Sequence, residues 1–250
     1  MKAGLSSSSP RTAPFRTANP TSTSFLVWFG LIAYLALVKI VITLLPASFR
    51  SPEQSAVFGW PFIGLWMVTG LIGIYFASKT GFPAAVDERL SNQRQFLPPI
   101  LLGLAFSLPF IAVDRLTHFT AWLAAQRGQP GINIDFPASV LIYSGGAVIV
   151  EVFYRLFLVP LLLWLISNVL LKRRGQEGIF WALALITSLI EPLTQDLDLA
   201  QLGVGVMLTV IGLNYSLNFA QAVLFRKYGF LAAILMRVAF YAIWHIVYVH

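Results

Sequence analysis

Long apolar runs separated by short polar stretches dominate the sequence from about residue 25 onward. The first two runs, 25–46 and 56–77, each have 22 residues, enough for a helix to cross the roughly 30 Å hydrocarbon core of a bilayer. The same pattern along the rest of the chain predicts seven spans, at 25–46, 56–77, 97–121, 137–171, 178–191, 200–225 and 228–249. We therefore expect an all-α, polytopic integral membrane helix bundle.

Two of these runs have unusual lengths. The run from Phe136 to Leu171 would be roughly 54 Å long as one helix at ~1.5 Å per residue, so it must tilt, bend or extend past the bilayer. Pro160 is the expected bend because it removes a backbone N–H. The run 178–191 is short for a span, and the sequence leaves open whether it crosses fully. The clusters Gly145-Gly146 and Gly203-x-Gly205 predict close helix packing.

Composition agrees with a membrane protein. Hydrophobic residues make up 58% of the chain and charged residues 11%, and the mean hydropathy is +0.77. The first 23 residues are rich in Ser, Thr and Pro and predict a disordered cytosolic tail before a transmembrane domain over 24–249. The chain has no cysteine, which excludes disulfides, thiolate metal ligands and cysteine nucleophiles.

The basic residues indicate membrane topology rather than nucleic-acid binding. The net charge is +7, but no nucleic-acid motif is present, and eleven Lys/Arg lie in the tail and alternate loops against two, Arg50 and Arg127, in the others. The positive-inside rule then predicts that the N-terminus is inside and the C-terminus outside. Membrane lipids are the expected partners, in a plasma membrane or an internal membrane such as the thylakoid.

Polar side chains within the spans carry the remaining information, because an ionisable group at mid-bilayer costs about 2.5–3.5 kcal/mol on insertion scales. Glu151 and Arg155 are one helical turn apart and should lie on one face. Two further stripes recur at helical spacing: Asn214, Asn218 and Gln221, and Arg237, Tyr241 and His245. Their common explanation is one shared, buried polar site.

Each of these positions also has a structural interpretation. Arg237 can serve folding by pairing with Glu151, since an unpaired buried arginine destabilises a protein. The asparagines can join helices, and His245 can be an interfacial side chain near the end of its span.

Two further polar pairs are expected to mark the ends of spans. They are Asp114-Arg115 and Glu191-Pro192. Glu191 would then lie at the outer end of its span while Glu151 lies near mid-depth, so the sequence does not predict that these two carboxylates meet.

These residues resemble a known family. Glu151-Val-Phe-Tyr-Arg155 is similar to the second half of the E-E-x-x-x-R motif of the CPBP intramembrane proteases, also called CAAX-prenyl protease II or Abi proteins. The stretch Tyr228 to Arg237 looks like that family's final helix, and the similarity covers about 137–249. The resemblance implies a membrane-embedded hydrolase in which glutamate and histidines hold a divalent metal such as zinc or polarise a water.

The departures from the family pattern put that chemistry in doubt. Val150 stands where the family has its first glutamate, and Glu191 stands at the histidine of the middle motif. In the last motif, Arg237 and Tyr241 replace a histidine and an asparagine. A guanidinium cannot coordinate a metal, so no metal is expected.

Three functional hypotheses follow from this pattern. The first is a diverged, non-catalytic relative that acts as a membrane scaffold or binds another membrane protein or a peptide substrate, with no cofactor. The second is a metal-dependent intramembrane endopeptidase with a variant site, catalytic through Glu151 and Arg155, whose metal ligands would be Glu151, Glu191 and His245. The third is a pathway for a small solute or an ion, because buried Glu, Arg and His can form a relay.

Overall fold

The computed structural model describes residues 22–44, 56–87, 90–126, 128, 134, 136–195 and 197–248. The described part of the chain is helical and contains no strand. The expected cytosolic tail lies outside it, apart from residues 22 and 23, which are already helical. The helices are α1 (Ser22–Leu44), α3 (Trp60–Lys79), α4 (Asn92–Thr117), α5 (Phe119–Gln126), α6 (Ala138–Glu151), α7 (Val159–Leu163), α8 (Gln176–Gln195), α9 (Val204–Tyr228) and α10 (Phe230–Tyr241).

Stretches of tighter or wider helix complete the fold. Three are π-helical, namely η2 (Val152–Leu158), η3 (Trp164–Leu170) and η5 (Ala242–Val247), and one is a 3-10 helix, η4 (Leu197–Gln201). Seven helical segments of the described chain are long and apolar enough to cross a membrane, as the sequence predicts. The chain is therefore an all-α polytopic bundle.

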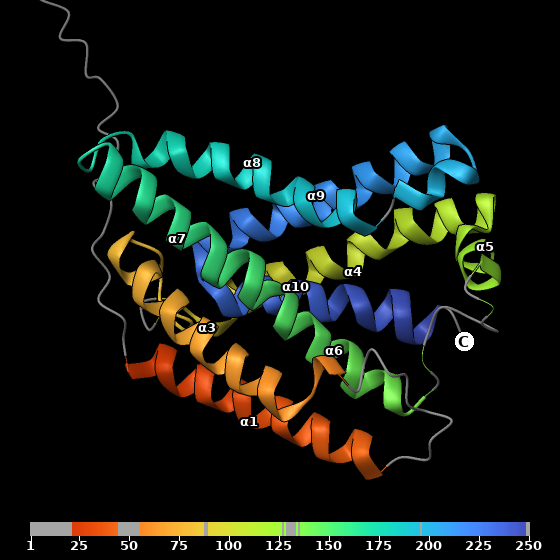
Figure 1. Cartoon of the computed structure of the whole chain (residues 1–250), viewed down its shortest axis with the longest axis horizontal. Helices are drawn as coiled ribbons and strands as arrows, with labels where there is room; N and C mark the ends of the chain where they lie inside the picture. Colours follow the sequence, from red (N-terminus) through yellow and green to blue (C-terminus); the bar gives the residue numbers. More distant parts are fainter. Residues whose placement is uncertain are drawn as a thin grey trace, which may run out of the picture.

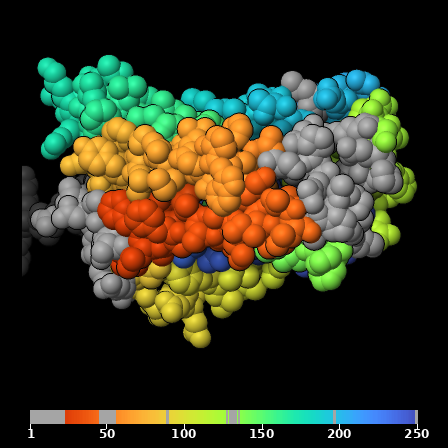
Figure 2. All heavy atoms as spheres, turned by 60° about the horizontal axis from the view of Figure 1, so that its bottom comes forward, coloured from red at the N-terminus to blue at the C-terminus, as the bar shows by residue number. Residues whose placement is uncertain are grey.

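Helix α10 occupies the middle of the bundle (Figure 1) and packs against α4, α6 and α9. Helices α1 and α3 lie side by side and form one outer face, which Figure 2 shows in red and orange. Helix α8 runs alongside α9 on the other side of the long α6–α7 segment. Side chains that point inward from α6, α8, α9 and α10 therefore share one interior.

Glycines let two pairs of these helices approach closely. A Cβ on Gly103 of α4 would lie 2.2 Å from the Met236 carbonyl oxygen of α10, and one on Gly73 of α3 would lie 2.5 Å from that of Leu156 in η2. The expected role of Gly145-Gly146 and Gly203-x-Gly205 holds only for Gly145, whose Cβ would meet Phe58. The other three have open space there, so that part of the prediction is wrong.

Helix α8 is longer than the apolar run that predicted it. Its 20 residues begin two residues before the predicted run and continue four beyond it. Glu191-Pro192 was expected to mark a helix end, but Pro192 lies inside the helix and is buried. By length and composition, α8 is long and apolar enough to cross a membrane, like the other six segments.

The third span also differs from prediction, whereas the bounds of the fourth agree with it to within one residue. The helix expected over 97–121 is two helices, because His118 adopts a left-handed conformation with φ 53° between α4 and α5. Asp114 fixes this turn by accepting hydrogen bonds from the Thr120 backbone N–H at 2.9 Å and its hydroxyl at 2.8 Å. The 33-residue span Ala138–Leu170 is continuous, with π-helical stretches before and after the segment that holds Pro160.

Candidate functional site

Polar side chains from all three predicted stripes, together with Glu191, meet in the interior of the bundle around one arginine. We name this group the Arg237 cluster. It consists of Glu151 from α6, Arg155 from η2, Glu191 from α8, Asn218 and Gln221 from α9, and Arg237 and Tyr241 from α10. All but the half-buried Tyr241 are buried.

The guanidinium of Arg237 joins the two carboxylates. Its Nε donates to Glu151 Oε1 at 2.6 Å, while Nη1 and Nη2 donate to Glu191 Oε1 and Oε2, both at 2.9 Å. The Glu191 pair has the two-pronged geometry that makes arginine–carboxylate contacts strong. The expected pairing of Arg237 with Glu151 is present, and Glu191 joins it although its position near the end of α8 gave no such prediction.

Three neutral side chains complete the shell of Arg237. Nη1 also donates to the Tyr241 hydroxyl at 3.1 Å, and Nη2 also donates to Asn218 Oδ1 at 2.6 Å and Gln221 Oε1 at 3.0 Å. Six acceptors thus surround a group that has five N–H bonds to give. The donor capacity of Arg237 is fully used inside the protein.

Arg155 is held much more loosely than Arg237. Its Nη2 donates to the Asn218 carbonyl oxygen at 2.9 Å, and its Nε lies 3.9 Å from Glu151 Oε2, which is an ion pair but too long for a hydrogen bond. Arg155 Nε and Nη1 and Glu151 Oε2 have no hydrogen-bond partner among the described residues, although the two side chains are 0% and 1% exposed. The predicted ion pair between Glu151 and Arg155 is present, and it is the longest charge contact of the cluster.

A proline helps to place Asn218 in the cluster. Pro192 has no N–H to donate to the Ser188 carbonyl oxygen one turn earlier in α8. Asn218 Nδ2 donates to that oxygen at 3.3 Å, while its Oδ1 faces Arg237. The Glu191-Pro192 dipeptide therefore supplies both a carboxylate for Arg237 and an acceptor for the asparagine that binds Arg237.

Aromatic rings extend the cluster along α10. The imidazole of His245 stacks on the Tyr143 ring at 4.3 Å between centroids and meets the Tyr241 ring edge-on at 4.8 Å. The Tyr143 hydroxyl accepts from the Ile134 backbone N–H at 3.1 Å, which ties this stack to the loop before α6. His245 is half-buried, so it belongs to this aromatic stack within the bundle rather than to the interface alone.

The residues of the cluster do not fit a divalent metal. Among the described residues, no group of three or more His, Asp or Glu side chains could hold a metal ion, and this includes the set Glu151, Glu191 and His245. The reason is visible in the contacts, because the guanidinium of Arg237 binds both carboxylates. Guanidinium nitrogens carry protons and have no lone pair for a metal.

The structure thus brings most of the predicted site together. Glu151, Arg155, Glu191, Asn218, Arg237 and Tyr241 are in contact, His245 stacks beside Tyr241, and Asn214 lies half-buried one turn before Asn218. Tyr143 was missed, because one tyrosine in an apolar run gives little signal. Its position eight residues before Glu151, about two helical turns along the same face, was the available clue.

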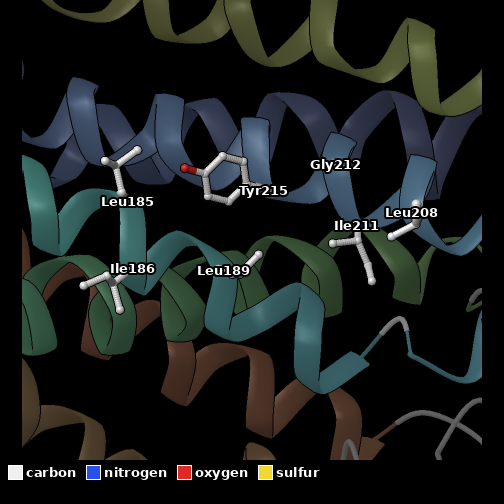
Figure 3. Close-up of a pocket in the computed structure, with 7 residues that line it drawn as sticks. All are labelled: Leu185, Ile186, Leu189, Leu208, Ile211, Gly212 and Tyr215. Carbon is white, nitrogen blue, oxygen red and sulfur yellow. The ribbon is translucent and has the colours of Figure 1, made fainter.

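A separate groove lies on the outer side of α8 and α9 (Figure 3). It has a volume of about 400 Å³ and an almost wholly apolar lining, in which Tyr215 carries the one side-chain polar group. None of the Arg237 cluster residues lines it, although both features use the same two helices. The lining residues are Leu185, Ile186, Leu189, Leu208, Ile211, Gly212 and Tyr215.

Comparison of the chain with protein-family models, with curated proteins and with solved structures gave no match.

Proposed function

We propose that this chain is a non-catalytic integral membrane protein, related to the CPBP intramembrane proteases, that acts as a membrane scaffold for another membrane protein or a peptide. The observation that carries the proposal is the engagement of Arg237. Its guanidinium binds Glu151 and Glu191 at the same time. Its remaining N–H groups donate to Asn218, Gln221 and Tyr241. The positive charge of Arg237 is therefore balanced by carboxylates within the protein.

Such a cluster is poorly suited to hydrolysis. A general base must accept a proton from a water that it contacts, and its lone pairs must be free to do so. Both Glu191 oxygens and one Glu151 oxygen instead accept from a permanently charged group. The remaining oxygen, Glu151 Oε2, accepts no hydrogen bond from the described residues, but it is buried and lies 3.9 Å from Arg155 Nε, so two permanently charged groups flank this carboxylate. Because Arg237 also stands between the carboxylates, we infer that the cluster offers neither a metal site nor a poised base.

The positions of these residues support a relation to the family. The resemblance places Glu191, Arg237 and Tyr241 at the family's histidine and asparagine positions, on the middle and the last of its motifs. In this protein these three side chains and Glu151 meet in one cluster. A glutamate and a permanent cation in place of two imidazoles keep the helices tied together while they remove the metal-binding chemistry, which is what we expect of a relative retained for its shape.

The test is a comparison of metal content and peptide cleavage in the purified full chain. Wild-type protein should contain no stoichiometric zinc by elemental analysis. It should also leave intact a panel of prenylated C-terminal peptides and membrane-span peptides followed by mass spectrometry. Metal-dependent cleavage that disappears in Glu151→Gln but persists in Glu177→Gln, an exposed glutamate of α8, would show instead the variant peptidase.

A second variant tests the family relation separately. Val150→Glu, Glu191→His and Arg237→His together restore the family's charges and imidazoles. If the relation is right, this variant should take up zinc and its unfolding temperature should rise when zinc is added. A folded triple variant that does not bind zinc would refute the alignment.

A separate measurement addresses the third hypothesis, a pathway for a solute or an ion. Proton or solute flux in proteoliposomes that is abolished by Glu151→Gln would favour it.

A further inference from the structure

One end of the bundle carries a rigid turn of basic residues. Residues 171–175 connect the end of the apolar span Ala138–Leu170 to the start of the apolar helix α8 at Gln176, at one end of the bundle (Figure 1). The turn contains Lys172, Arg173 and Arg174, all of which are exposed. Their side chains therefore extend at the level of the membrane surface.

The backbone of this turn is fixed and strained. Lys172 and Arg173 adopt left-handed conformations with φ 50° and 68°, which cost residues other than glycine about 1 kcal/mol or more each. Two backbone hydrogen bonds hold the turn, from Arg173 N–H to the Ser167 carbonyl at 2.7 Å and from Arg174 N–H to the Leu171 carbonyl at 3.0 Å. The backbone positions from which the three cationic side chains extend are therefore fixed.

These three cations have no anionic partner in the described part of the chain. The described ion pairs of the chain involve Arg155, Arg226 and Arg237 only. The neighbouring Arg226 differs, because it pairs with Glu177, donates to the Gly81 carbonyl and lies over the Phe82 and Phe180 rings. Arg226 thus holds α9, α8 and the loop after α3 together, whereas the turn residues contribute no such contact.

We propose that the Lys172–Gly175 turn is a binding site for the phosphate group of an anionic phospholipid. The charge complementarity is direct, since three unpaired cations face the layer in which anionic headgroups reside. Guanidinium groups bind phosphate oxygens in a bidentate manner, and each basic residue near an anionic membrane surface strengthens binding roughly fivefold. Lipid binding at this turn is independent of whether the Arg237 cluster is catalytic.

Native mass spectrometry of the purified full chain with added lipid tests this proposal. Wild-type protein should retain phosphatidylglycerol in preference to phosphatidylcholine. The variant K172Q/R173Q/R174Q should lose that preference by roughly fivefold or more, and the charge-conserving variant K172R/R173K/R174K should keep most of it.

The matched control removes the same number of charges from other exposed cations that lie near helix ends. The variant K79Q/R94Q/K227Q leaves the turn intact and should change the preference clearly less than the turn variant does, because its three cations lie on three separate helices. Equal losses in both triple variants would overturn the proposal, because the effect would then be general surface charge. Displacement of the bound lipid by equimolar inorganic phosphate would also overturn it, since the site would then select a free anion.

Discussion

Arg237 Nε lies 2.6 Å from Glu151 Oε1, although the two residues are 86 positions apart in the sequence. The other side of the same guanidinium binds Glu191, so one side chain of α10 is tied to both α6 and α8. Removal of one member of a buried ion pair is strongly destabilising because the partner charge stays behind without compensation. Arg237 is therefore the position at which the bundle should be most sensitive.

Arg237→Met should lower the free energy of unfolding by about 3–5 kcal/mol. The substitution leaves the carboxylate of Glu191 buried without a cation and that of Glu151 with only its 3.9 Å ion pair to Arg155. Unfolding in mixed micelles, followed by circular dichroism during titration with a denaturing detergent, measures the change. Arg115→Met is the matched control, because Arg115 is exposed and its guanidinium lies 5.2 Å from the centre of the Tyr248 ring, a contact worth about 0.5–1 kcal/mol.

The carboxylates explain this loss only if neutralising them restores stability. The variant Arg237→Met with Glu191→Gln should be more stable than Arg237→Met alone, since the one remaining carboxylate, Glu151, keeps its ion pair with Arg155. If the double variant is less stable than the single one by the sum of separate effects, the charge cluster is not what stabilises the bundle.

Arg155→Met should cost clearly less stability than Arg237→Met. Both arginines are buried, but Arg155 makes one hydrogen bond to the described residues and stands 3.9 Å from its carboxylate, whereas Arg237 makes six hydrogen bonds. The same titration ranks the two variants. A loss for Arg155→Met that equals or exceeds the Arg237→Met loss would mean that Arg155 has contacts beyond the described ones.

Gly103→Ala should destabilise the bundle by about 1–3 kcal/mol, the usual cost of overpacking. Its Cβ would lie 2.2 Å from the Met236 backbone oxygen, which cannot move aside like a side chain, so α4 and α10 would have to separate. Gly212→Ala is the control within a helix, because a Cβ there meets nothing within 4 Å. Both variants gain the same helix propensity, so a difference in their unfolding transitions reports the packing between α4 and α10 alone.

Several elements were predictable because they depend on local composition. The seven spans follow from apolar runs long enough for a bilayer, and the ion pair of Glu151 with Arg155 follows from helical spacing. Helix bounds were less predictable where a short segment was interpreted alone. The run 178–191 looked too short because Glu191 and Pro192 are unfavourable in an isolated apolar helix, yet in α8 they are buried and Glu191 binds Arg237. The break of the third span at His118 likewise depends on Asp114 and Thr120 meeting across the turn.

By itself, the sequence determined that this protein is a helical membrane bundle with costly polar side chains on facing stripes, because hydropathy and helical period are properties of neighbouring residues. Only the tertiary structure decided how those polar groups are paired. It placed Arg237 between Glu151 and Glu191 and left Arg155 with one hydrogen bond. These pairings depend on the relative depth and rotation of α6, α8, α9 and α10. No local pattern encodes that depth, since it results from the close approach of whole helices at residues such as Gly103 and Gly73.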